Sequence, residues 1–161
     1  MHRRKNKAGP LRRITLAIDT SDASAKALAF VLTKFQPDHS TEKGGRAPFH
    51  VSVLHVIKRQ PLAPITVRFT APWIKSEQKV KDISRRLVDQ TVQQLIKAGF
   101  TAEPIHKIGD PAEEIMNMAA KQHTDMIVMG AKGLSAIDRI LLGSVSTRVV
   151  QYANCPVLVV R

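Results

Sequence analysis

Two glycine-containing bends near the end of the chain hold the residues whose types and spacing best suit ligand chemistry. Gly130 and Gly133 directly follow a strand-like run at 125–129, and Gly143 and Ser144 open a helical pattern after a gap of nine residues. Glycine lets the backbone approach a ligand closely, and a helix N-terminus offers unpaired N–H groups and a partial positive charge. The spacing predicts that these amides, with the Ser144 hydroxyl, bind phosphate oxygens.

This spacing is neither a Walker A loop nor the dinucleotide-binding G-x-G-x-x-G pattern. The alternative interpretation is two ordinary turns, because glycine often follows a strand. The strand–loop–helix setting favours phosphate binding. Lys132 lies inside the first bend, and we expect it to be solvated.

Strand-like and helix-like segments alternate along the whole chain, which predicts an α/β fold: a doubly wound, parallel, five-stranded sheet with helices on both faces. Ligands of such sheets bind at the carboxyl ends of the strands. Asp19 ends the first expected strand and Gly130 follows the fourth, so they can converge there. We expect strands at 13–19, 49–57, 101–108, 125–129 and 157–160, and helices at 23–35, 74–98, 111–123, 136–141 and 145–153.

Local signals predict where several elements begin, end and lie. Ser21 or Asp22 is expected to cap the first helix, and Asp110, followed by proline and a glutamate at the third helical position, to cap another. Pro104 indicates an edge strand. The segment 58–72 contains three prolines and is expected to be irregular, with an extended piece at 65–69. Gly99 fits the C′ position of the long helix, whose expected inner stripe is Val80, Ile83, Leu87, Thr91 and Leu95.

Composition limits the possible classes of protein. The 161 residues fit one domain, and the net charge of +12 includes six cations within residues 1–13. We expect a basic flexible arm at 1–11, a nucleotide-binding domain at 12–161 and a mobile surface loop at 37–48. The arm has no aromatic residue for base stacking and no nucleic-acid-binding motif follows it, so nucleic acid is a disfavoured partner. No apolar run could span a bilayer, and the single Cys155 fits a reducing cytoplasm.

The glycine bends resemble the ATP-binding signature of the universal stress protein family. The resembling segments are 129–133 and 143–146, with the nine-residue gap between them. The segments 18–21, 54–57, 109–115 and 155–160 fit the same family pattern in the same order, so the resemblance covers nearly the whole chain after about Leu11. Thr20 departs from it, because many members have glycine there.

The resemblance implies a sheet of order 3-2-1-4-5, usually a homodimer formed through the last strand, and bound ATP with Mg²⁺ or Mn²⁺ bridging the phosphates. By the same resemblance Asp19 hydrogen-bonds the ribose, the Val56 backbone meets the adenine and Gly130 lies by the ribose. The signature residues Gly133, Gly143, Ser144 and Val145 hold the phosphates. The cofactor-binding residues so implied are Asp19, Val56, Met129, Gly130, Gly133, Gly143, Ser144, Val145 and Ser146.

Other polar residues receive no chemical role. We expect His55 to be a buried, hydrogen-bonded histidine rather than a metal ligand, and the histidines and Cys155 show no zinc spacing. Glu113 and Glu114 occupy a helix's first turn, where they complement the dipole. Asp19 has an alternative role as a helix cap.

The sequence thus favours a cytoplasmic, dimeric, ATP-binding protein that acts as a nucleotide-dependent module of stress response or signalling. No catalytic residue is assigned, and binding rather than turnover is the expected output. One alternative is a protein-interaction module with a basic arm, in which ATP, AMP or a cyclic adenine nucleotide is a modulator. Another is a slow ATP hydrolase.

Overall fold

The computed structural model describes residues 11–35, 49–59, 64–68, 70–132 and 142–161. Its centre is a five-stranded sheet of order β3-β2-β1-β4-β5, and every neighbouring pair is parallel. Both the doubly wound class and the strand order are therefore confirmed. Pro104 lies on the edge strand β3, as predicted. The strands are β1 (Arg13–Ala17), β2 (His50–Lys58), β3 (Thr101–Gly109), β4 (Met126–Gly130) and β5 (Val157–Val160).

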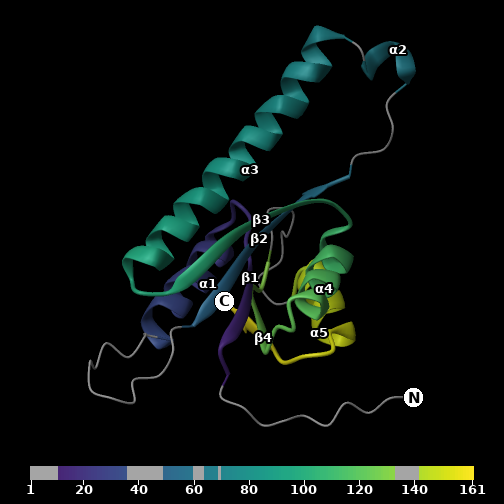
Figure 1. Ribbon diagram of the computed structural model, residues 1–161. Helices are drawn as coiled ribbons and strands as arrows, with labels where there is room; N and C mark the ends of the chain where they lie inside the picture. The colour runs from purple at the N-terminus through teal and green to yellow at the C-terminus, as the bar shows by residue number, and fades with distance from the viewer. Residues whose placement is uncertain (1–10, 36–48, 60–63, 69, 133–141) are drawn as a thin grey trace.

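Helices cover both faces of the sheet (Figure 1). The helices α1 (Asp22–Lys34) and α3 (Ala71–Lys97) lie on one face, while α4 (Pro111–Lys121) and α5 (Ser144–Tyr152) lie on the other. A single turn, α2 (Ile65–Arg68), lies at the outer end of α3, which runs well beyond the sheet. Right-handed crossovers between parallel strands produce this two-sided covering.

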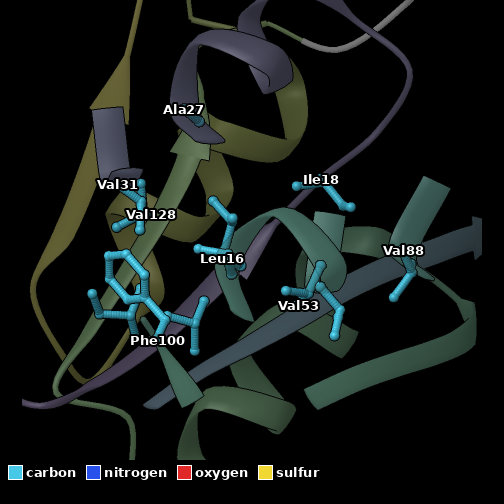
Figure 2. Packing of buried hydrophobic residues seen from close by; sticks show 12 residues of the cluster. Leu16, Ile18, Ala27, Val31, Val53, Val88, Phe100 and Val128 are labelled. Atoms are coloured by element: carbon cyan, nitrogen blue, oxygen red, sulfur yellow. The ribbon is translucent and has the colours of Figure 1, made fainter. Parts of the chain in front are cut away.

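Each face of the sheet has its own hydrophobic cluster. Figure 2 shows the cluster under α1 and α3, where Leu16 and Val53 of the sheet meet Val31 of α1 and Val88 of α3. The opposite cluster joins Leu54 and Ile127 to Ile115 of α4 and Val149 of α5. Because both faces are covered, the central strands are almost continuously buried, as parallel strands in α/β proteins are.

The helix ends follow the predicted capping chemistry. Ser21 is the N-cap of α1 and its side chain accepts a hydrogen bond from the Ser24 N–H; Asp110 does the same for the Glu113 N–H at the start of α4. Gly99 has a φ of 88° at the end of α3. The N–H of Phe100 bonds to the Leu95 carbonyl there, which completes a Schellman motif and confirms Gly99 as C′.

Two expectations between β2 and β3 are wrong. The piece at 65–69, expected to be extended, contains the helical turn α2, in which the Pro64 carbonyl accepts hydrogen bonds from Val67 and Arg68 N–H groups. In α3, Val80 and Ile83 are 39% and 46% exposed rather than inward-facing. The fully buried residues of α3 begin only at Ser84, because the first half of the helix extends past the sheet.

Several expected features lie outside the described residues: the basic arm, the loop at 37–48, the helix at 136–141 and Gly133. Within the described part of the chain, no helix is both long and apolar enough to cross a membrane.

Candidate functional site

The carbonyl oxygen of Ala131 joins the two glycine bends. The Gly143 N–H donates to it at 2.8 Å and the Ser146 hydroxyl at 2.7 Å, while the Ala131 N–H donates to the Val160 carbonyl at 2.7 Å. Ala131 and Ser146 are both buried. The segment after β4 and the first turn of α5 are therefore held together at the carboxyl edge of the sheet, where the sequence analysis expects the two bends to meet.

The turn after β1 joins the same cluster. Asp19 Oδ1 accepts hydrogen bonds from the Ser21 N–H, at 3.0 Å, and from the Ser21 hydroxyl, and the Asp19 N–H donates to Ser24 Oγ at 2.9 Å. Ser21 Oγ also lies 3.2 Å from the Lys132 carbonyl oxygen, an acceptor in the first glycine bend. Asp19 thus braces the helix cap rather than being the cap, and among the described residues its Oδ2 has no hydrogen-bond partner.

Gly130 is required by packing at this point. A Cβ built on it would lie 2.6 Å from the Ala23 carbonyl carbon and 2.8 Å from the Ser24 nitrogen, both backbone atoms of the α1 start. Only glycine lets the end of β4 come this close to α1. Gly130 therefore brings the first bend against the α1 N-terminus and has a structural role that the sequence did not indicate.

The first turn of α5 presents its amides at the same edge. Gly143 is the N-cap, and its carbonyl accepts from the Thr147 N–H at 2.9 Å. A helix's first N–H groups have no intrahelical acceptor, which leaves those of Ser144 and Val145 for a ligand. The Gly143 N–H, by contrast, already binds Ala131, and the Ser146 hydroxyl binds the Ala131 and Gly143 carbonyls. Within the described chain, the Ser144 hydroxyl makes no hydrogen bond.

Val56 lies in the part of β2 that extends beyond the end of β1. The β1–β2 register ends at Ala17–Leu54, and the Leu54 carbonyl accepts the last bond on that side, from the Ile18 N–H, at 2.9 Å. Backbone groups of alternate residues in a parallel strand face the same neighbour. The N–H and carbonyl of Val56 therefore point toward the side where β1 has ended, so they can hydrogen-bond a planar ligand.

Two predicted site residues remain, Met129 and Gly133. Met129 is 5% exposed and lies in the α4–α5 cluster, so its side chain belongs to the core. Gly133 is not among the described residues. The structure brings Asp19, Gly130, Gly143 and Ser146 together through the hydrogen bonds and close contacts described above.

Comparisons with known proteins identify the family of this chain. The sequence profile of the universal stress protein family matches residues 10–161. The chain belongs to the universal stress protein family. It is 32% identical over 156 residues to the universal stress protein YxiE of Bacillus subtilis, covering 92% of this chain and 98% of YxiE. It is 28% identical to MJ0531 of Methanocaldococcus jannaschii over 93% of this chain and 82% of that relative.

Solved structures of similar proteins share the fold. The structure of MJ0577 superposes with a TM-score of 0.74 at 28% identity, over 93% of this universal stress protein and 95% of that chain. An Arabidopsis thaliana family member solved with AMP bound superposes with a TM-score of 0.62 at 21% identity, over 92% and 90% of the two chains. A family member in complex with cAMP superposes with a TM-score of 0.64 at 20% identity, over 93% and 97%.

A histidine pair lies beside the site of this universal stress protein. His55 Nδ1 is 2.7 Å from Ser84 Oγ of α3, and the same oxygen is 3.4 Å from Nδ1 of His106, which lies opposite His55 in the register. Burial lowers the pKa of His55; the Asp19 carboxylate acts against this shift and His106 adds to it. The predicted hydrogen bond of His55 is confirmed, but the residue is half-buried rather than buried. Its lowered pKa favours the neutral imidazole.

An ion pair holds α5 beside α4. Arg148 Nη1 lies 3.0 Å and 2.9 Å from the two Asp110 carboxylate oxygens, and Nη2 lies 3.4 Å from Glu113 Oε1. The Glu113 N–H and the Arg148 guanidinium outweigh desolvation and lower the pKa of Asp110. Both partners are partly exposed, so the pair orients α5 more than it stabilises the fold.

Sequence reasoning missed the two residues that join the site. Ser21 was expected only as a cap, and Ala131 had no role. The spacing of Asp19 and Ser21 is an available signal, because an aspartate often bonds the backbone two residues on. Ala131 acts through its carbonyl, so its side chain gives no signal.

Proposed function

We propose that this universal stress protein binds an adenine nucleotide, predicted from the sequence to be ATP, and acts as a nucleotide-dependent module of stress response or signalling. The observation that carries the proposal is the shared Ala131 carbonyl, which holds the α5 N-terminus against the segment after β4. Helix N-terminal amides held at a sheet's carboxyl edge form an anion-binding site without further groups.

The phosphates are assigned to the amides of Ser144 and Val145, the Ser144 hydroxyl and the predicted residue Gly133. The Gly143 N–H and the Ser146 hydroxyl position this turn, since both bind carbonyls within the protein. In this proposal, Gly143 and Ser146 belong to the site because they position the turn, and they do not contact the phosphates through these two groups.

The nucleoside end is assigned to the other side of the cluster. Asp19 Oδ2 would accept a ribose hydroxyl, while Oδ1 stays bonded to Ser21. The Val56 N–H and carbonyl would pair with the adenine edge, and the backbones of Met129 and Gly130 would line the ribose. Of these groups only the Asp19 carboxylate is charged, and it is placed at the sugar. The adenine would meet uncharged backbone groups, which suits a neutral base.

Relatives support an adenine nucleotide without fixing the number of phosphates. Family members with this fold have been solved with AMP, with cAMP and with dAMP. Among the described residues, no three His, Cys, Asp or Glu side chains gather into a metal-binding group. A Mg²⁺ or Mn²⁺ ion accompanying ATP would therefore be held mainly by phosphate oxygens and water, as is common for Mg²⁺.

The proposal also includes a homodimer and a cytoplasmic location. The edge strand β5 pairs only with β4 in the described sheet, and its four residues are half-buried, so a second copy could pair with its free edge. Sedimentation at several protein concentrations tests this homodimer, with a proline at Val159 as the disrupting variant. A cytoplasmic location, which the single cysteine predicts, is also proposed.

Calorimetric titration of nucleotide-free protein with ATP, ADP, AMP and cAMP tests the proposed function. We expect saturable binding of at least one nucleotide, and loss of binding in Gly143→Glu, whose carboxylate would enter the anion site. Absence of binding by the wild type, or equal binding by the variant, would reject the proposal. Mass spectrometry of small molecules released from the purified, denatured protein then identifies the natural ligand.

A further inference from the structure

The first half of α3 extends past the sheet, and it is more apolar than an exposed helix requires. All five buried residues of α3 lie from Ser84 onward. Between Ala71 and Ile83 none is buried, and Figure 1 shows this part of the ribbon beyond the sheet. Burial against the sheet therefore does not explain the apolar residues in this half.

Four apolar residues of α3 form one ridge, whereas Ile74, which is 54% exposed, lies off it. Trp73, Val80, Ile83 and Leu87 are spaced by seven, three and four residues, which places them on one side of a helix that turns about 100° per residue. Leu87 packs against the core, Ile83 is 46% and Val80 39% exposed, and Trp73 is half-buried. The ridge thus runs outward from the core along the exposed part of the helix.

A basic flank runs beside the ridge. Lys75, Lys79 and Arg86 repeat at helical spacing, and with Gln78, Asp82 and Ile83 they line an open hollow of about 380 Å³. Asp82 is the one acid of this hollow, and its carboxylate accepts a hydrogen bond from the Gln78 amide at 2.9 Å. Three cations against one carboxylate, next to exposed aliphatic side chains, make a surface suited to an anionic partner with an apolar layer.

Charge selects among possible occupants. If the helices of two copies packed ridge to ridge in antiparallel orientation, the flanks that carry Lys79 and Arg86 would face each other across the seam and repel. Nucleic acid would leave Val80 and Ile83 without a partner. A lipid surface satisfies both groups, because aliphatic side chains insert between headgroups while lysine and arginine contact phosphates.

The orientation of the helix also favours a flat partner. By helical geometry, the apolar ridge points roughly 80° and the basic flank roughly 175° away from the buried stripe of α3. The ridge and the basic flank therefore adjoin around the helix, and because this half of α3 extends past the sheet, a plane can approach it there. Trp73 is of the residue type enriched at the membrane–water boundary.

We propose that the first half of α3 binds an anionic lipid surface, with Trp73, Val80 and Ile83 inserting between headgroups and Lys75, Lys79 and Arg86 contacting their phosphates. This lipid-binding surface is independent of the proposed nucleotide site, since the two share no residue.

Trp73 is the chain's one tryptophan, so its fluorescence reports on this surface alone. The full-length protein is titrated with vesicles of phosphatidylcholine and with vesicles of equal parts phosphatidylcholine and phosphatidylglycerol. We expect a blue shift and quenching by brominated acyl chains only with the anionic vesicles, and weakening with salt. No change in the Trp73 spectrum with anionic vesicles would overturn the proposal.

Charge placement is tested by matched variants. Lys79→Glu with Arg86→Glu is expected to weaken binding by at least about 25-fold, since each cation near a lipid surface contributes roughly fivefold. Lys26→Glu with Lys34→Glu on α1 changes the net charge equally and should have a smaller effect. Equal losses in the two variants would show attraction by net charge alone and reject the site.

The apolar ridge is tested by Val80→Asn with Ile83→Asn, which should weaken vesicle binding while the midpoint of urea unfolding stays unchanged. Polyglutamate serves as the competing acidic polymer. If it binds more tightly than anionic vesicles at the same salt and the apolar variant binds vesicles normally, the surface fits an acidic protein and the lipid proposal fails.

Discussion

The Ser146 hydroxyl lies 2.7 Å from the Ala131 carbonyl oxygen, which also accepts the Gly143 N–H at 2.8 Å. One acceptor at the end of β4 thereby fixes both the N-cap and the third residue of α5. Because Ser146 is 2% exposed, this bond is shielded from water. The direction of the α5 amides depends on this contact.

Removing this hydroxyl should loosen the start of α5. We expect Ser146→Ala to lower the free energy of unfolding by about 1–2 kcal/mol, because it leaves a buried carbonyl with one donor fewer. Nucleotide affinity should fall with it. Urea denaturation measures the change, and Ser144→Ala, which removes an exposed hydroxyl from the same turn, is the control. Equal stability of the two variants would contradict the fastening role of Ser146.

A methyl group on Gly130 should displace the end of β4 from α1. The added Cβ would meet Ala23 backbone atoms at 2.6 Å, so Gly130→Ala is expected to cost about 1–3 kcal/mol. Gly109→Ala is a matched control at the end of β3, where the three atoms nearest to the Cβ all belong to the Glu114 side chain, the closest at 3.0 Å. Thermal unfolding should show the larger loss for Gly130→Ala, and the reverse order would argue against this packing role.

Stability should decrease in mild acid because of His55. Its pKa is lowered mainly by burial, with Asp19 opposing and His106 adding, so the unfolded chain binds the proton first. The contribution is therefore complete above the unfolded value of 6.5 and is lost as the pH falls from there through the folded pKa. Urea titrations across this range should show a smaller loss in His55→Gln. Identical pH profiles for variant and wild type would refute the assignment.

A substitution at the C-terminal end of α4 should stabilise the protein. His123 has a φ of 51°, and the Thr124 N–H bonds to the Ala119 carbonyl in a Schellman motif closed by a residue other than glycine. We expect His123→Gly to raise the free energy of unfolding by about 0.5–1 kcal/mol, since glycine adopts positive φ without steric cost. Gln122→Gly, at a φ of −83°, should instead destabilise. A calorimetric melting temperature that falls in His123→Gly would contradict this.

Local chemistry made most of the fold predictable. Ser21 and Asp110 specify helix starts, Gly99 specifies a helix end and Pro104 an edge strand, because each acts through backbone groups within a few residues. Helical crossovers between successive strands imply a parallel sheet, which brings the carboxyl ends of the strands to one edge. The resemblance to a family with a known sheet supplied the strand order.

The features that the sequence analysis did not predict depend mostly on contacts between distant segments. Val80 and Ile83 continue the periodicity of α3, and sequence cannot show that the sheet ends before them. Ala131 acts through its carbonyl, and Gly130 is explained by the backbone of Ala23, far away in sequence. Pro64 starts a helical turn in a β-branched segment for which propensity predicts an extended chain.

The most direct test of the nucleotide site is an amide NMR titration of the full-length protein with ATP, AMP and adenosine. If α5 amides grip the phosphates, the N–H resonances of Ser144 and Val145 should shift with ATP and AMP but hardly with adenosine. The Asp19 resonance should respond to any of the three that binds. Unmoved Ser144 and Val145 resonances at saturating nucleotide, or equal shifts with adenosine, would contradict the account.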